Sequence, residues 1–128
     1  IVFPVHPRTS KMLAQFGIEL SRNIHQLPPL GFLESLYLWK DAALVITDSG
    51  GLQEETTALG IPCLTLRENT ERPVTVTEGT NKLVKVEALE KEVAEVLAGR
   101  GKSGNVPDLW DGKAAERIVD VITNLTNQ

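Results

Sequence analysis

Short apolar runs rich in β-branched residues alternate with helical patterns along the whole sequence. Runs of strand length occupy residues 1–5, 23–27, 43–47 and 62–66, and a weaker fifth run occupies residues 82–86. Helical patterns occupy residues 10–16, 32–40, 52–59, 87–98 and 113–124, and Gly17, Gly60 and Gly99 end three of them. This order is typical of βαβ units. It predicts an α/β fold, a Rossmann-like parallel sheet of about five strands with helices on both faces.

The size and charge of the chain exclude several classes of function. Its 128 residues fit one domain, and a net charge of -4 without a long basic run argues against nucleic acid. Cys63 is the single cysteine, so neither an internal disulfide nor a cysteine metal cluster is expected. The apolar runs are too short to cross a membrane. We expect a cytoplasmic protein without membrane contact and, since Ile1 already opens a strand pattern, a piece of a longer chain.

The turn after the third expected strand has the features of an anion site. It contains Asp48, Ser49, Gly50 and Gly51, and the next helix begins within it. Ligands of open α/β sheets bind beyond the carboxyl ends of the strands, where glycines allow close approach and helix amides attract anions. Glu55 lies one turn further along, where it suits a ribose diol. The alternative is an ordinary turn in which Asp48 or Ser49 only caps the helix.

The loop after the fourth expected strand is basic. Arg67 and Arg72 occupy residues 67–73, and guanidinium groups bind diphosphates through paired hydrogen bonds. Because consecutive parallel strands are usually neighbours, we expect this loop to lie close to residues 49–51. The alternative is that the arginines pair with Glu68 and Glu71 on the surface. We expect Arg72 to bind the ligand and Arg67 to form an ion pair.

The loop after the first expected strand ends in His6, Pro7 and Arg8. His6 is able to donate a hydrogen bond to a phosphate or a sugar, and Arg8 adds positive charge. Thr9 and Ser10 are candidate caps for the next helix. A single histidine is more often structural than catalytic, so the pattern alone leaves the role of His6 open.

Together these segments resemble UDP-N-acetylglucosamine 2-epimerases, in particular their archaeal branch. The resemblance rests on residues 47–55, 66–73 and 78–81, on the opening residues 4–9, and on residues 109–118, in the family's order. It implies one half of a two-domain arrangement of the GT-B type. Residues 1–128 would be the C-terminal, UDP-binding domain, without the first elements of that domain. The other half is the N-terminal domain, which is the expected partner together with the UDP-sugar.

The resemblance assigns five residues to the diphosphate and the ribose. Ser49, Gly50 and Gly51 would bind the diphosphate through backbone amides and the Ser49 hydroxyl. Glu55 would hold the ribose hydroxyls, and Arg72 would neutralise phosphate charge. No metal and no cofactor is implied.

Three more residues are assigned to the base and to a second site. Leu30 would contact uracil through its backbone. Ser35 occupies the position where the family often has an aromatic residue near the uridine, so this sequence departs from the family pattern there. His6 matches a histidine that lies near a second UDP-sugar in the allosterically regulated bacterial enzymes.

The implied activity is the interconversion of UDP-GlcNAc and UDP-ManNAc by elimination and re-addition of UDP, in polysaccharide biosynthesis. The family's proton-transferring carboxylates lie in the N-terminal domain, so this chain is expected to bind UDP but to be inactive alone. The intact enzyme is expected to be a homodimer. A hydrolysing outcome stays open. Two other classes also stay open, the donor-binding domain of a GT-B glycosyltransferase and a non-catalytic nucleotide-sugar sensor.

Overall fold

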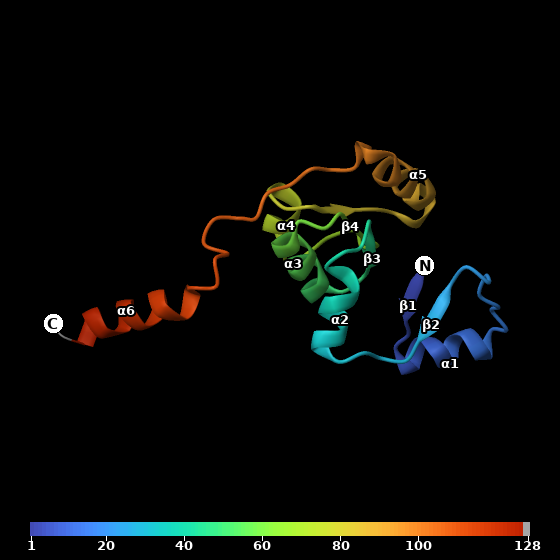
Figure 1. The fold of residues 1–128 in the computed structure, drawn as a ribbon, viewed down its shortest axis with the longest axis horizontal. Coiled ribbons are helices and arrows are strands. Elements are labelled where there is room, and N and C mark those ends of the chain that lie inside the picture. Colours follow the sequence, from blue (N-terminus) through green and yellow to red (C-terminus); the bar gives the residue numbers. More distant parts are fainter. Residues whose placement is uncertain (127–128) are drawn as a thin grey trace. The chain divides into compact units, whose positions relative to one another are not determined.

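The apolar runs of the sequence form five short strands, and every strand pair is parallel. The structure is a computed structural model that describes residues 1–126. It divides into two compact units, Ile1–Leu38 and Trp39–Gln128. Figure 1 labels helices α1–α6 and strands β1–β4, and each unit is described by itself.

The first unit contains a two-stranded sheet. Strand β1 (Val2–Pro4) pairs with β2 (His25–Leu27), and α1 (Pro7–Gln15) connects them. Val5, which follows β1, is 3% exposed, and its amide donates to the carbonyl of Leu27 at 2.9 Å. Helix α2 (Phe32–Trp39) begins after the second strand.

The second unit contains a three-stranded sheet in the order of the sequence. Strands β3 (Val45–Thr47), β4 (Cys63–Thr65) and β5 (Asn81–Leu83) are neighbours in that order. Thr47 is in register with Thr65, and Thr65 with Leu83. The loops after β3 and β4 therefore begin at the same edge of the sheet, as the alternation predicted.

Helices cover both faces of this three-stranded sheet. The Asn81 side chain bonds to Gln53 of α3 (Gly50–Leu59), whereas the next side chain, Lys82, bonds to Glu92 of α5 (Leu89–Glu95) at 2.6 Å. Successive strand residues point to opposite faces, so α3 and α5 lie on opposite sides. The short α4 (Pro73–Thr77) precedes β5.

The layer between α3 and the sheet is polar. The side chains buried there without exposed area are Gln53, Thr56, Thr57, Thr65, Thr75 and Asn81. Cys63 is buried beside them, and burial raises the pKa of its thiol. Buried polar groups require hydrogen-bond partners, so their geometry is more specific than that of an apolar layer.

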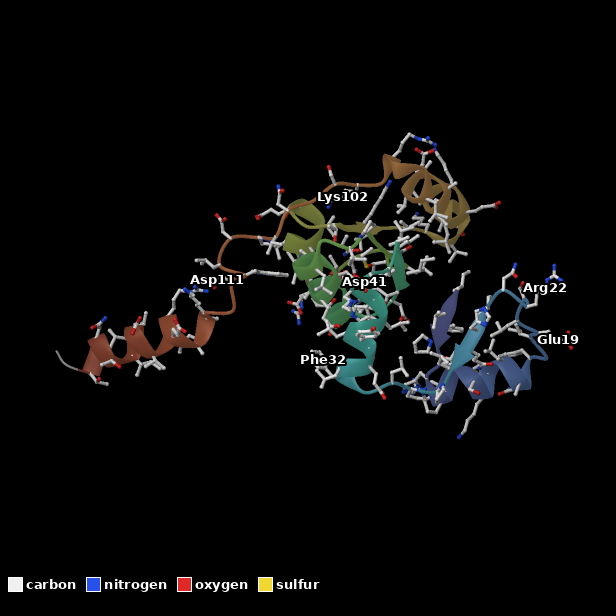
Figure 2. The ribbon with its side chains drawn as sticks, viewed as in Figure 1. Glu19, Arg22, Phe32, Asp41, Lys102 and Asp111 are labelled. Carbon is white, nitrogen blue, oxygen red and sulfur yellow. The ribbon has the colours of Figure 1, made fainter. Side chains whose placement is uncertain are left out.

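The chain beyond β5 returns across the second unit. It forms a 3₁₀ turn (Val86–Ala88), α5, a π turn (Val96–Arg100) and α6 (Ala114–Thr126). Between the π turn and α6 it crosses α4 and β5, where Lys102 (Figure 2) donates to the carbonyls of Val76, of Gly79 at 2.6 Å and of Asn81 at 2.9 Å.

Several predicted boundaries were wrong. Helix α1 begins at Pro7, so Thr9 and Ser10 lie inside it, and its N-cap is His6. The fifth strand is Asn81–Leu83, because residues from Val86 already turn into a 3₁₀ helix. The helix expected at residues 87–98 is interrupted, and α4 was missed altogether. Gly60 does end α3 in the left-handed region, with φ of 71°.

Candidate functional site

The turn after β3 leads directly into α3, as the sequence predicted. Ser49 is the N-cap residue in an extended conformation, and Gly50 and Gly51 are the first two residues of the helix. Within the described residues the Ser49 hydroxyl makes no capping hydrogen bond, while the Ser49 amide donates to Thr47 Oγ1 at 3.0 Å. The alternative interpretation, in which the Ser49 side chain only caps the helix, is therefore not seen, and its hydroxyl lies at the start of α3.

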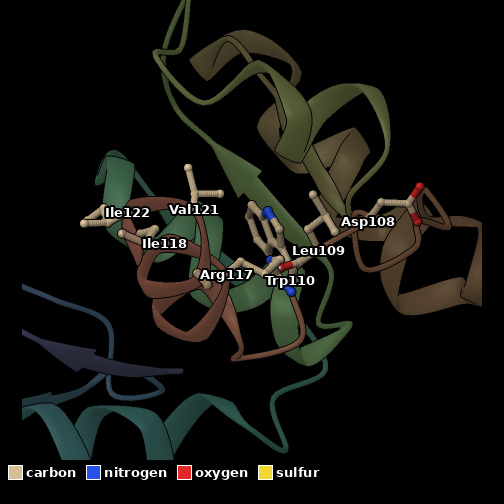
Figure 3. A pocket seen from close by; sticks show the side chains of 8 residues that line it. Asp108, Leu109, Trp110, Arg117, Ile118, Val121 and Ile122 are labelled. Carbon is tan, nitrogen blue, oxygen red and sulfur yellow. The ribbon is translucent and has the colours of Figure 1, made fainter. Parts of the chain in front are cut away.

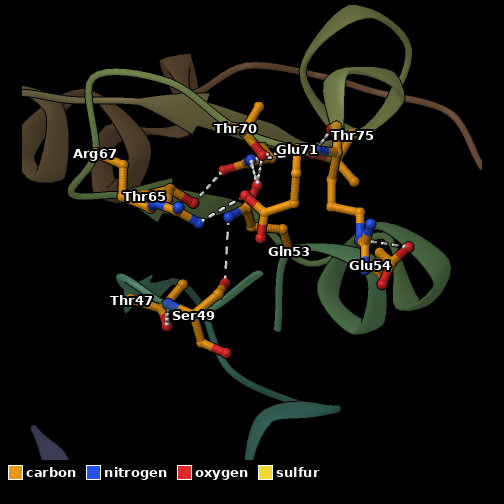
Figure 4. Close-up of polar contacts among 11 residues, drawn as sticks. Thr47, Ser49, Gln53, Glu54, Thr65, Arg67, Thr70, Glu71 and Thr75 are labelled. Atoms are coloured by element: carbon orange, nitrogen blue, oxygen red, sulfur yellow. Dashed lines mark hydrogen bonds and ion pairs between the residues drawn. The ribbon is translucent and has the colours of Figure 1, made fainter. Parts of the chain in front are cut away.

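The loop after β4 lies against this turn. A Cβ built on Gly50 would be 2.4 Å from Glu71 Oε1, whereas one built on Gly51 meets nothing within 4 Å. Figure 4 shows Glu71 with Ser49 and Gln53. The predicted approach of the two βα loops is thus confirmed, and a carboxylate lies over the first glycine of the helix.

The two arginines of this loop each form an ion pair. Arg67 Nη1 donates to Glu71 Oε2 at 2.9 Å, which confirms the expected pairing of Arg67. The pKa of Glu71 is lowered, first by a hydrogen bond from its own backbone and further by the charge of Arg67. Arg72 Nε contacts Glu54 Oε1 of α3 at 3.0 Å. The Arg72 guanidinium is therefore held against α3 through its Nε atom.

Glu55 lies in the second turn of α3. Its Oε2 atom is buried and has no hydrogen-bond partner among the described residues. An unsatisfied buried carboxylate oxygen is costly, so it marks a position where a donor group would be stabilised.

The other three predicted site residues belong to the first unit. His6 caps α1, since its Nδ1 accepts from the Arg8 amide at 3.2 Å. Leu30 lies between β2 and α2, and Ser35 lies in the first half of α2. His6 thus has the structural role that the sequence left open, and the ligand contacts of all three residues stay predictions.

A buried hydrogen-bond network connects the two loops of the second unit, and sequence reasoning missed it. Gln53 Oε1 accepts from Thr70 Oγ1 at 2.7 Å and from Asn81 Nδ2 at 3.0 Å, and Gln53 Nε2 donates to the Ser49 carbonyl at 3.2 Å. Asn81 Nδ2 also donates to Thr75 Oγ1 at 3.1 Å. The sequence offered no stronger signal than polar residue types at Gln53 in α3, at Thr70 in the loop after β4 and at Asn81 in β5.

A separate hollow of about 650 Å³ lies beside the start of α6 (Figure 3). Leu109, Trp110 and Ile118 line it with apolar atoms. Arg117, which also lines it, is bound to Asp111 at 2.9 Å and to the Leu109 carbonyl at 2.8 Å. Its lining is that of a packing surface rather than of a nucleotide site.

Across residues 1–126, no group of three or more histidine, cysteine, aspartate or glutamate side chains is placed to hold a metal ion. In the same residues no helix is long and apolar enough to cross a membrane.

Comparison with known proteins identifies the family. A profile of UDP-N-acetylglucosamine 2-epimerases matches residues 1–123. The chain belongs to this family. The UDP-N-acetylglucosamine 2-epimerase of Methanocaldococcus jannaschii is 44% identical over 96% of this chain, and that of Methanococcus maripaludis is 43% identical over 95%. The chain spans about a third of the length of these relatives, 35% and 34%.

A solved structure supports the fold of this epimerase-family chain. The Methanocaldococcus jannaschii UDP-GlcNAc 2-epimerase, in complex with UDP-GlcNAc and UDP, superposes with a TM-score of 0.80. The two chains are 44% identical, and their alignment covers 97% of this chain and 35% of the Methanocaldococcus jannaschii chain. The predicted family and the predicted α/β class with parallel strands are confirmed.

Proposed function

We propose that this chain is the C-terminal, UDP-binding domain of a UDP-N-acetylglucosamine 2-epimerase with a two-domain arrangement of the GT-B type. The intact enzyme interconverts UDP-GlcNAc and UDP-ManNAc. The observation that carries this proposal is the match of nearly the whole chain to an epimerase solved with UDP-GlcNAc and UDP.

The diphosphate binds at the start of α3. The amides of Gly50 and Gly51 and the Ser49 hydroxyl supply hydrogen bonds, and the helix dipole favours negative charge there. Arg72 adds a full positive charge from the second loop. The approach of that loop to Gly50 supports a shared ligand, because an anion at the helix start would lie beside both loops.

The ribose binds at Glu55. The buried, unpartnered Oε2 of this side chain is an acceptor without a donor, and a ribose diol supplies two donors. Its place in the second turn of the helix separates it from the diphosphate amides by about one turn, roughly 5 Å. Glu55 therefore selects a nucleotide over a bare diphosphate.

The contribution of this domain to catalysis is electrostatic. In the elimination step a base removes the proton from C2 of the sugar, the bond from C1 to the UDP oxygen breaks, and a C1–C2 double bond forms. In the return step UDP adds to C1 while C2 is protonated on its opposite face. Arg72 and the α3 amides stabilise the charge that develops on the departing diphosphate. The proton transfers belong to the N-terminal domain.

The proposal also includes the remaining assignments. Leu30 contacts uracil, Ser35 lies near the uridine, and His6 lies near a second UDP-sugar. The intact enzyme is a cytoplasmic homodimer, and sedimentation of the intact enzyme would test its dimeric state.

Two experiments test the proposal. With the intact enzyme and UDP-GlcNAc alone, formation of UDP-ManNAc is expected, because epimerisation needs no acceptor. A transferase would instead require an acceptor, and a sensor would bind without turnover. The isolated 128-residue chain is expected to give no turnover. Turnover by the isolated chain that survives Ser49→Ala and Arg72→Ala would contradict this division of labour.

A further inference from the structure

The hydroxyl of Thr70 connects the core of the second unit to the backbone of Arg72. Thr70 Oγ1 donates to Gln53 Oε1 at 2.7 Å and accepts from the Arg72 amide at 2.9 Å. A hydroxyl group donates one hydrogen bond and accepts another at the same time, and an alkyl group does neither. The backbone at Arg72 is therefore held by a side chain two residues earlier, and that side chain is held by α3.

Gln53 contacts the other loop with its remaining group. Its Nε2 donates to the carbonyl of Ser49, the residue before the glycine turn, at 3.2 Å. The Gln53 side chain is fully buried, and Asn81 fixes its carboxamide oxygen from the sheet at 3.0 Å. One rigid side chain thus bonds to both loops that the proposed function places around the diphosphate (Figure 4).

The opposite side of Arg72 is anchored in the same network. The Arg72 carbonyl accepts from Thr75 Oγ1 at 2.7 Å, and Thr75 Oγ1 accepts from Asn81 Nδ2 at 3.1 Å. Both peptide groups of Arg72 are therefore bound to side chains that lead to Asn81 and Gln53. Loops are otherwise the most mobile parts of a fold, and a displacement of about 1 Å is enough to weaken a charge-assisted contact.

We propose that Thr70 and Gln53 are positioning residues that hold the Arg72 backbone in register with the start of α3, so that Arg72 and the α3 amides bind the same diphosphate. This inference rests on the proposed function. It adds two residues that do not touch the ligand and act through Arg72. Gln53 binds the Thr70 hydroxyl from α3, and the Thr70 hydroxyl binds the Arg72 amide in the loop, so the position of the loop depends on that of α3.

The test measures binding of UDP and of uridine to the intact enzyme by calorimetry. Thr70→Val removes the hydroxyl at nearly constant shape and is expected to weaken UDP binding about tenfold. Uridine lacks the diphosphate, so its affinity is expected to stay within about twofold. Thr70→Ser keeps the hydroxyl, so its affinity for UDP is expected to stay close to that of the wild type. Should Thr70→Val not fold, Thr70→Ala carries the same expectation.

A matched control lies in α3. Thr57 is also a buried threonine, but its hydroxyl has no partner among the described residues. Thr57→Val is therefore expected to leave UDP affinity unchanged. In the Arg72→Ala background, Thr70→Val is expected to cause no further loss, because its effect passes through Arg72.

The outcomes separate the two proposals. A wild-type enzyme that does not bind UDP overturns the proposed function, and this inference with it. A wild type that binds UDP while Thr70→Val behaves like Thr57→Val overturns the inference alone. Equal losses for UDP and uridine, or additive losses of Thr70→Val and Arg72→Ala, overturn it as well, since both indicate a general loss of structure.

Discussion

The Nε atom of Arg72 contacts the Glu54 carboxylate of α3 at 3.0 Å. The two residues come from different βα segments, and both side chains are about two-fifths exposed, 43% and 42%. An ion pair this exposed contributes little to stability, about 0 to 1 kcal/mol. Its effect is geometric, because it holds the Nε side of the guanidinium against α3, the helix whose first amides are the proposed diphosphate site.

Arg72 and Arg67 are therefore expected to differ in binding. Arg72→Ala should weaken UDP binding by roughly 1.5 to 3 kcal/mol, because a charge-assisted contact is lost. Arg67→Ala should cost much less, because a terminal nitrogen of Arg67 already binds Glu71, whereas Arg72 contacts Glu54 through Nε. Calorimetry on the intact enzyme measures both variants. Equal losses would mean that the partners of the two arginines are assigned wrongly.

Glu55 is expected to contribute to binding of the nucleoside part of the ligand and not of its diphosphate. Glu55→Gln should weaken UDP and uridine by roughly 1 kcal/mol, because a carboxylate accepts hydrogen bonds more strongly than an amide. Binding of inorganic diphosphate should be nearly unchanged. Titrations with all three ligands check this, with Glu68→Gln in the exposed loop as the control. An effect of Glu55→Gln that persists with bare diphosphate would rule out a ribose contact.

The elements that carry the site were predictable because their signals are local. Each signal lies within a few residues of the element that it predicts. The apolar run before Thr47 predicts strand β3, Gly50 and Gly51 mark the start of α3, and Gly60 marks its end. Parallel pairing of β3 with β4 then follows from the order of the elements.

The contacts within the site were not predictable in the same way. Helix α4 was missed because its Val-Thr-Val-Thr run favours a strand, and Pro73 at its first position is the local signal that favours a helix start. The pair of Arg72 with Glu54, and the bonds from Gln53 to Thr70 and Asn81, join segments far apart in the chain. Such pairs depend on the packing of α3 against the sheet, which no local pattern encodes.

Glu71 is expected to compete with the ligand. Its carboxylate lies over Gly50, at the helix end that also attracts phosphate, and a carboxyl group is charged at neutral pH. The pKa of Glu71 is lowered further, first by a hydrogen bond from its own backbone. Glu71→Gln should therefore tighten binding of inorganic diphosphate several-fold, with Glu68→Gln as the matched control. Binding constants at low and high salt check this, since the difference between the variants should shrink as salt screens the charge. Weaker binding in Glu71→Gln would show instead that Glu71 supports the site.

Lys102 is expected to be a structural residue, essential for stability and not for ligand contacts. Its ammonium donates to three backbone carbonyls around α4 and β5, and partial burial lowers its pKa. Lys102→Met keeps the length of the side chain but removes all three donors, so the carbonyls lose charged partners. We expect a loss of about 2 to 4 kcal/mol in the free energy of unfolding, since a hydrogen bond to a charged group contributes about 1.5 to 3 kcal/mol and such losses are not additive.

Urea denaturation of the chain measures the loss caused by Lys102→Met. The control is Lys85→Met, at an exposed position, which should change stability by less than about 0.5 kcal/mol. UDP affinity of the folded Lys102→Met protein should stay near that of the wild type. A variant as stable as the control would mean that the segment crossing α4 and β5 is held by other contacts, such as the Asn105 amide that donates to the Glu78 carbonyl at 2.9 Å.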